Sequence, residues 1–239
     1  MADLADVRQK ILKEFAEAVR KYPKPRTASG AQLYAHQVGG ALRNIVKRNI
    51  GSDVLTDGFL TPEAAEALIR DPLGAGWKIV AEATGEMQTK ANIAAGFHVR
   101  ATAATVNGSR VNGMVALATD QEFEAAAPKV YQCFDNIMRV AADTTIRNNF
   151  TAMHDAGVKV EVVRIPNAGA CGWCQDIAKA GPYDYEDVRR GGEVWLRHLD
   201  CACVIETRAS GRSQRSYVRL RDKEEQRRVN AEITKERNR

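Results

Sequence analysis

Four of the five cysteines in this sequence lie within 33 residues and beside a histidine, and this clustering constrains the fold more than any other feature. A Cys-Gly-Trp-Cys turn is followed by 23 residues and then by His-Leu-Asp-Cys-Ala-Cys. Zinc binds four thiolate or imidazole ligands in a tetrahedron, and a C-x-x-C turn brings two thiolates to one ion. The spacing therefore predicts a structural zinc site, with five candidate ligands for four positions: Cys171, Cys174, His198, Cys201 and Cys203.

The sequence leaves the ligand set and two other interpretations open. Cys201 and Cys203 point to the same side of an extended segment, so either could be the fourth ligand. A disulfide or redox pair formed by Cys171 and Cys174 is one alternative, and plain buried cysteines are another. The redox interpretation leaves His198 unexplained, and the chain lacks the repeated βαβ pattern of a thioredoxin-like sheet. A catalytic zinc is disfavoured because there is no H-E-x-x-H motif and no obvious glutamate base beside the ligands.

Apolar residues recur at steps of three and four over much of the chain, which predicts amphipathic helices. Asp3 is placed to cap the first helix, and Thr61-Pro62-Glu63 is typical of a helix start. Gly157 is placed to end the longest helix, in which Cys133 stands apart from the other cysteines. The helices are expected at about 3–22, 30–49, from 61 onwards, 75–95, in a short stretch beyond an Asn107-Gly108 turn, and at 121–156.

The hydrophobic period changes from helical to alternating after Gly157. Val158, Val160 and Val162 alternate with Lys159 and Glu161, which predicts a strand, and a second apolar run covers 202–205. We therefore expect a mainly α fold. It comprises a helical body at 1–157, a small α+β zinc-binding module at 158–207, and a basic tail at 208–239, helical or disordered.

The positive charge of the chain belongs to that tail. The chain carries 35 Lys/Arg and 30 Asp/Glu, a net charge of +5. Residues 208–239 hold 11 of the basic and 5 of the acidic residues, a net of +6, so the rest of the chain is almost neutral. Such a tail could bind nucleic acid by displacing counterions from phosphates, or it could be a solvated or protein-docking helix.

Several functional classes find no support in the sequence. It has no phosphate-binding glycine motif and no nucleophile elbow, and His36, His98 and His154 have no spaced partner. The sequence has no run of about 18 apolar residues, the length needed to cross a membrane. Its acidic N-terminus is unlike a secretory signal peptide. These features predict a soluble, non-enzymatic protein in a reducing compartment.

The cysteine–histidine region resembles a viral family. The string Gly169-Ala170-Cys171-Gly172-Trp173-Cys174 and the ending Arg197-His198-Leu199-Asp200-Cys201-Ala202-Cys203 are its most specific parts. They resemble the C-terminal region of tailed-phage minor capsid proteins, the head-morphogenesis family related to the Mu F protein. The similarity extends over roughly 75–207 and includes 143–149, 163–166, 183–185, 95–97 and 106–114. Leu199-Asp200 and Ala202 depart from residues common in that family, while the ligand pattern is kept.

The resemblance implies a structural role in a virion. Such a protein is a low-copy head component, made in the bacterial host cytoplasm and placed near the portal or the capsid interior. Its expected partners are the portal protein or the major capsid protein, with packaged DNA reached through the basic tail. A membrane and a small-molecule substrate are not expected. Some relatives carry an enzyme domain after the zinc module, whereas only the 32-residue tail follows here. A zinc-containing nucleic-acid-binding protein and, behind it, a thiol oxidoreductase are the alternatives.

Overall fold

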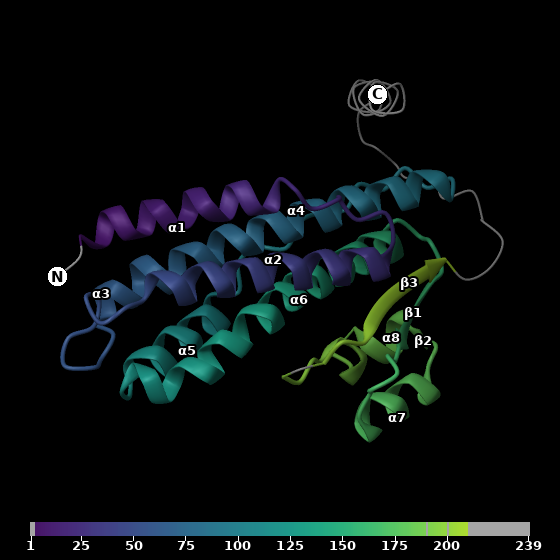
Figure 1. The fold of residues 1–239 in the computed structure, drawn as a ribbon. Helices are drawn as coiled ribbons and strands as arrows, with labels where there is room; N and C mark the ends of the chain where they lie inside the picture. The colour runs from purple at the N-terminus through teal and green to yellow at the C-terminus, as the bar shows by residue number, and fades with distance from the viewer. Residues whose placement is uncertain (1–2, 190, 200, 210–239) are drawn as a thin grey trace.

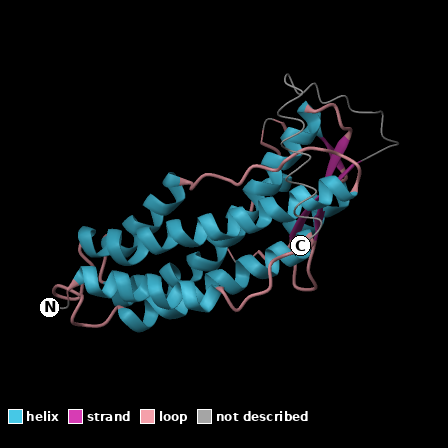
Figure 2. Cartoon of the chain, turned by 90° about the horizontal axis from the view of Figure 1, so that it is seen from above, coloured by secondary structure: helices cyan, strands magenta, loops and turns pink. Residues whose placement is uncertain are grey.

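Long helices make up most of the part of the chain that the computed structural model describes, residues 3–189, 191–199 and 201–209. They lie side by side, and a small antiparallel sheet lies at one end of them (Figures 1 and 2). This confirms the mainly α fold with a small α+β C-terminal part. The helices are α1 (Leu4–Val19), α2 (Ala28–Asn49), α3 (Pro62–Ala65), α4 (Asp71–Ala94), α5 (Gly108–Thr119), α6 (Phe123–Asp155), α7 (Gly172–Ala180) and α8 (Tyr185–Val188).

Side-chain caps define where several of these helices begin. Asp3 accepts a hydrogen bond from the Ala5 amide, and Thr61 accepts one from the Ala64 amide, as the sequence predicted. Asn107 differs from the expectation. It caps α5 by accepting from the Arg110 amide, so Asn107-Gly108 is a helix start and not a turn before the helix.

The helix predicted at about 75–95 begins earlier than its hydrophobic pattern indicated. Helical structure runs without a break from Pro62 to Ala94, through a π turn at Glu66–Arg70. Pro72 has no amide hydrogen to donate to the carbonyl of Leu68, four residues earlier. The π turn directly precedes that defect, so the extra residue lets the helix continue through a position that would otherwise break it.

The main hydrophobic core lies between α6 and the helices around it, above all α2 and α4. Trp77, Leu42, Phe134 and Met138 are completely buried there. The helices α2 and α6 approach closely at Gly39, where a Cβ atom would lie 2.7 Å from the Cα of Asp135. The α2–α6 contact is therefore set by backbone approach as well as by side-chain packing.

A second core forms where α6 ends and the sheet begins. Strand β1 (Val160–Ile165) pairs antiparallel with β2 (Tyr183–Asp184) on one side and with β3 (Val204–Ala209) on the other. Val160 and Val162 of β1 pack with Ile205, and the last turns of α6 contribute Phe150 and Met153 to the same cluster. The predicted strand is thus present, and α6 belongs to both cores.

The expected boundary at residue 157 coincides with a sharp change of backbone direction. Helix α6 ends at Asp155, and Gly157 has a φ of 79°, a left-handed conformation that glycine adopts without strain. The division into 1–157 and 158–207 stays a prediction. Of the expected tail, Arg208 and Ala209 belong to β3, and the rest lies outside the described residues.

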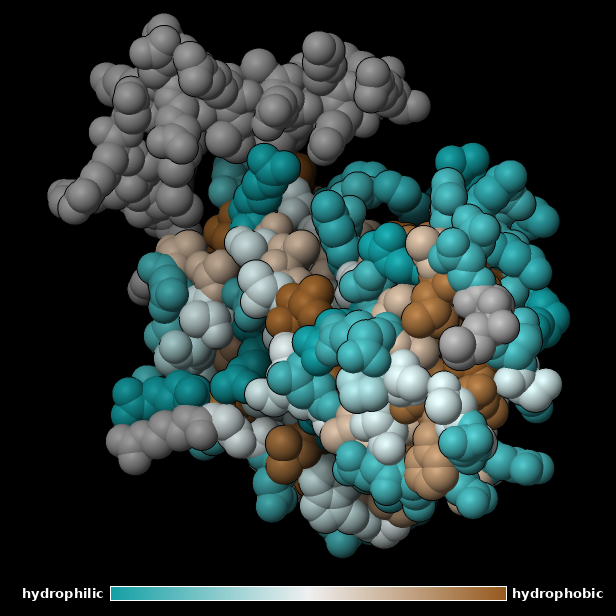
Figure 3. All heavy atoms as spheres, turned by 90° about the vertical axis from the view of Figure 1, so that its left-hand side faces the viewer, coloured by the Kyte–Doolittle hydropathy of each residue, from teal (hydrophilic) through white to brown (hydrophobic). Residues whose placement is uncertain are grey.

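The surface is mixed on the face that Figure 3 shows. There, hydrophobic side chains lie as separate spots among hydrophilic ones. Within the described part of the chain, no helix has both the length and the hydrophobicity needed to cross a bilayer.

Candidate metal centre

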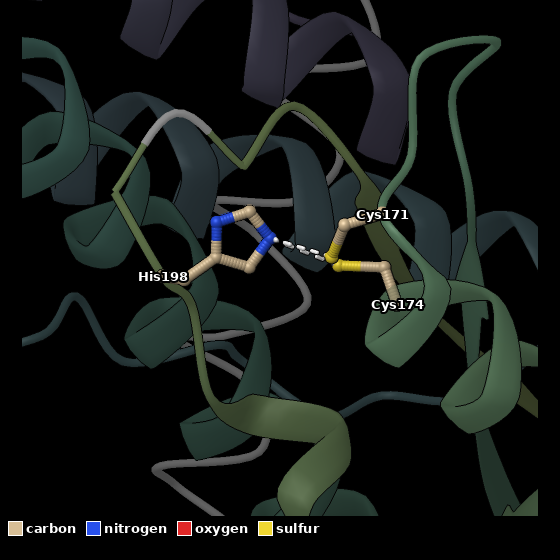
Figure 4. A group of neighbouring side chains, drawn as sticks. All are labelled: Cys171, Cys174 and His198. Atoms are coloured by element: carbon tan, nitrogen blue, oxygen red, sulfur yellow. Dashed lines mark hydrogen bonds between the residues drawn. The ribbon is translucent and has the colours of Figure 1, made fainter.

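Two of the predicted ligands lie at the beginning of α7. Cys171 is the N-cap residue of this helix and is exposed, whereas Cys174, in the first turn, is completely buried. Because the C-x-x-C segment turns into the helix here, both sulfur atoms face the same point in space (Figure 4). Local helix formation therefore produces the first half of the donor set.

His198 approaches these sulfur atoms from the opposite side (Figure 4). Its Nε2 atom lies 3.3 Å from the Sγ of Cys171 and 3.3 Å from the Sγ of Cys174. Its Nδ1 atom lies 2.5 Å from the carbonyl oxygen of Leu199. In the neutral imidazole with its proton on Nδ1, this carbonyl would accept that proton's hydrogen bond and Nε2 would be the metal-binding atom.

Cys201 and Cys203 complete the cluster just before β3. The Sγ atoms of Cys174 and Cys201 are 3.7 Å apart. The potential ligand atoms form two overlapping groups, each within 4.8 Å: Cys171, Cys174 and His198 in one, and Cys174, Cys201 and Cys203 in the other. The structure thus brings all five predicted residues together around Cys174.

The distances fit a tetrahedral zinc ion. A Zn–S bond of about 2.3 Å and a Zn–N bond of about 2.0–2.1 Å give tetrahedral edges of about 3.8 Å for S···S and about 3.5 Å for S···N. The observed 3.7 Å and 3.3 Å are close to these values. Cys171, Cys174 and His198 form one group, and Cys201 joins it through Cys174, so soft and borderline donors of the kind that zinc prefers are present to hold a metal ion.

A buried arginine contacts the thiols. Arg164 of β1 is 3% exposed, and its Nη2 atom donates to the Sγ of Cys201 at 3.0 Å and to the Sγ of Cys174 at 3.6 Å. Its Nη1 atom donates to the carbonyl oxygens of Val194 and Leu196. No carboxylate is among the partners that the described residues give Arg164. The guanidinium also lies 5.1 Å from the ring of Trp173.

The charges around the cysteines favour different protonation states. Burial raises the pKa of Cys174 to about 12, against the opposing effect of Arg164. Burial acts in the same direction on Cys201, yet its pKa is lowered, because Arg197, the Cys203 amide and Arg164 stabilise the thiolate. The Arg164 pKa is raised, since Cys201 and Cys174 outweigh the effect of burial. The surroundings therefore make the Cys201 thiol more acidic than the Cys174 thiol.

Spacing alone did not identify the residues that surround the ligands. Arg164, Arg197 and Asp143 lie in segments that carry the family resemblance, but only the fold shows their contacts with the cluster. One sequence signal exists for Arg164: it follows Val160 and Val162 at alternate positions of a strand and so points to the buried face.

The other residues singled out in the sequence lie away from the centre. Cys133 is half-buried on α6 and packs at the edge of the main core. His36 of α2 has its Nδ1 atom 2.7 Å from Asp135 of α6, and His154 stacks on the ring of Tyr185 at 3.5 Å. These two histidines therefore have partners distant in the sequence, which its spacing did not indicate.

Fold and site together define a mainly helical protein whose C-terminal part carries a cysteine–histidine cluster able to hold a metal ion. A family model described as VG15 protein matches residues 35–226. The chain therefore belongs to the VG15 protein family, a viral protein family, which is consistent with a phage protein. Comparison with curated proteins and with solved structures finds no match.

Proposed function

We propose that the protein is a minor capsid protein of a tailed bacteriophage, a structural component of the head with a role in head morphogenesis. Membership of a viral family supports a viral role. The observation that carries the finer proposal is the cluster itself: the R-H-x-x-C-x-C ending and the C-x-x-C turn, which resemble the minor capsid family, have donor atoms 3.3–3.7 Å apart.

The metal proposed for the cluster is zinc, held by Cys171, Cys174, His198 and Cys201. These four are linked by the short distances given above, and the sulfur of Cys201 accepts a hydrogen bond from Arg164 at 3.0 Å. A zinc ion bound here would supply a cross-link between the start of α7 and the segment before β3. A small three-stranded sheet gains stability from such a cross-link because it buries little apolar surface of its own.

The proposed partners are the portal protein or the major capsid protein, with packaged DNA as a further contact of the basic tail. A non-enzymatic role is proposed as well. Four protein ligands would fill the tetrahedral coordination of a zinc ion and leave no position for a substrate or a reactive water molecule.

Analysis of purified phage particles tests the structural role. Mass spectrometry should detect this chain in intact, DNA-containing heads at a copy number far below that of the major capsid protein. A null mutant should form fewer infectious particles or aberrant heads. Finding the chain only in the lysate, with normal particles lacking it, would contradict the proposal.

Metal analysis and thiol titration test the zinc site. Purified protein should contain about one zinc ion per chain, and its clustered thiols should react slowly until a chelator is added. The thiol oxidoreductase alternative predicts fast reaction of Cys171 without a chelator, together with a reducible disulfide to Cys174. The nucleic-acid-binding alternative predicts tight DNA binding with a steep salt dependence that is lost on deletion of 210–239.

A further inference from the structure

A second buried arginine joins the cysteine segment to the helical body. The side chain of Arg197 is completely buried. Its Nη1 atom donates to the carbonyl oxygen of Cys201 at 2.5 Å, and its Nη2 atom donates to that of Cys203 at 2.9 Å. Arg197 also directly precedes His198. One guanidinium therefore binds the backbone carbonyls of the proposed ligand Cys201 and of Cys203.

The opposite side of Arg197 faces the long helices. Nε donates to Asp143 of α6 at 2.7 Å, and Nη2 donates to the other oxygen of the same carboxylate at 3.1 Å. Gln32 of α2 completes the group: its oxygen accepts from Arg197 at 3.2 Å, and its amide donates to Asp143 at 2.6 Å. Asp143 and Gln32 are 4% and 2% exposed, so the network is shielded from water.

This network can be satisfied only when the cysteine segment is in its metal-binding conformation. A buried guanidinium without its acceptors costs a large desolvation penalty, and so does a buried carboxylate without its cation. Those acceptors include the carbonyls of Cys201 and Cys203. Asn136 of α6 adds a further tie, because its side-chain amide donates to the carbonyl of His198 at 2.9 Å. The helices thus hold the segment where its side chains face Cys174.

We propose that Arg197 is a positioning residue for metal binding, through which the α2–α6 interface sets the zinc affinity of the C-terminal centre. The inference rests on the proposed zinc site. Arg197, Asp143 and Gln32 do not contact the ion. They hold the ligand segment in place before the ion binds, so binding loses less conformational entropy. By thermodynamic reciprocity, zinc binding strengthens the attachment of this segment to α2 and α6 to the same extent.

Zinc affinity of the full-length chain tests this inference. Competition with a chromophoric zinc chelator should show affinity about 10–100-fold weaker in Arg197→Gln and in Asp143→Asn, the usual effect of losing an outer-shell partner. Arg197→Lys should recover part of the loss, because lysine keeps the charge but cannot bind the carboxylate and both carbonyls with a planar fork. The matched control is Arg139→Gln. Arg139, like Arg197, is a nearly buried arginine. It lies on α6 and pairs with Asp135, and its loss should leave zinc affinity unchanged.

Hydrogen exchange supplies a readout that a general loss of stability would not produce. In the wild-type chain, adding zinc should slow amide exchange around Gln32 and Asp143 as well as around Cys171 and Cys174. In Arg197→Gln, zinc should still protect the Cys171–Cys174 turn, while the zinc-dependent protection around Gln32 should disappear.

The outcomes separate this inference from the zinc proposal. Wild-type protein that binds no zinc overturns both. Wild-type zinc binding together with unchanged affinity in folded Arg197→Gln overturns only the positioning role. If Arg197→Gln does not fold, Arg197→Lys and Asp143→Asn decide the question by the same two measurements, and unchanged zinc affinity in both of them overturns the inference.

Discussion

Arg164 occupies a strand position that normally holds an apolar residue. The alternation of β1 places it on the same buried face as Val160 and Val162. A guanidinium there needs an anion, because an unpaired buried charge costs several kcal/mol. The groups that face it are the thiols of Cys174 and Cys201. A zinc ion with three thiolates and one histidine carries a net charge of −1, and Arg164 would neutralise it.

Substitution of Arg164 tests this role. Arg164→Gln should weaken zinc binding by about 10–100-fold, because the thiolates lose their hydrogen-bond donor and their counter-charge. Arg164→Lys should have a smaller effect, since it keeps the charge. Arg189→Gln is the control, because Arg189 lies in the same part of the chain and forms an exposed ion pair with Glu186. Equal affinity in Arg164→Gln and Arg189→Gln would show that Arg164 does not act on the metal.

Single substitutions of the last two cysteines should identify the fourth ligand. Cys201→Ser should lower zinc affinity by more than about 100-fold, beyond the loss of an outer-shell partner, and should reduce the thiolate-to-metal absorption of the cobalt-substituted protein. Cys203→Ser should keep both properties, because the proposed fourth ligand is Cys201, whose sulfur lies 3.7 Å from that of Cys174. The reverse pattern would assign Cys203 as the ligand.

The sequence predicted the donor set better than its surroundings. Spacing was sufficient for Cys171 and Cys174, because a C-x-x-C segment at a helix start determines its own geometry. The position of His198 depends on two long-range hydrogen bonds. Asn136 binds the His198 carbonyl, 62 residues away, and Arg197 binds Asp143, 54 residues away. No local pattern encodes such pairs, so the long-range contacts of the centre could only come from the fold.

At the scale of single elements, the close contact between α2 and α6 depends on Gly39 and not on its neighbour Gly40. A Cβ atom on Gly39 would lie 2.7 Å from the Cα of Asp135 and 3.1 Å from the carbonyl oxygen of Phe134. Both are backbone atoms, so neither can move without displacing α6. A Cβ atom on Gly40 would meet only the end of the Arg43 side chain at 3.9 Å.

Alanine substitutions at these two positions should therefore have opposite effects. Gly39→Ala should lower the free energy of unfolding by about 1–3 kcal/mol, the usual cost of forcing extra atoms into a packed contact. Gly40→Ala should raise it by up to about 1 kcal/mol, because alanine is the better helix former. Thermal or urea unfolding of the two variants measures both values. A loss of stability in Gly40→Ala as large as that in Gly39→Ala would contradict the close-approach argument.

Elements with strong local signals agree with their predictions. Caps at Asp3 and Thr61, and the glycine after α6, act through residues only a few positions away. The helices expected from 61 onwards and at 75–95 form one continuous helical segment, because a π turn at Glu66–Arg70 joins α3 to α4 and carries the helix past Pro72. The strand β3 begins in the apolar run noted at 202–205 and extends to Ala209, because pairing with β1 includes polar residues such as Glu206 and Thr207.

At the scale of the whole molecule, the metal centre and the main core should respond differently to metal removal. Chelation, or the double substitution of Cys171 and Cys174 by Ser, should abolish the protection of the β1–β3 sheet from hydrogen exchange. Most of the helical circular dichroism should remain, because the core around Trp77 contains no proposed ligand. Full loss of helix on chelation would show that the molecule unfolds as one unit, and a full thermal transition of the sheet without metal would argue against the zinc proposal.

The shared use of α6 by two cores was beyond sequence analysis. Its hydrophobic stripe predicted one long helix, but a stripe does not show which neighbour each part meets. Phe134 packs in the main core, while Phe150, four turns further along, packs against the sheet. Both residues have the same pattern and the same burial, so only the tertiary structure separates them.

The length of α6 has a mechanical consequence. A helix of 33 residues spans about 50 Å, and its one proline, Pro128, lies in its second turn, so no proline stands between Phe134 in the main core and Phe150 in the second core. It is therefore a rigid connection between the main core and the second core. A displacement of the sheet end would therefore be carried along the helix axis to the main core, because no proline between Phe134 and Phe150 provides a kink.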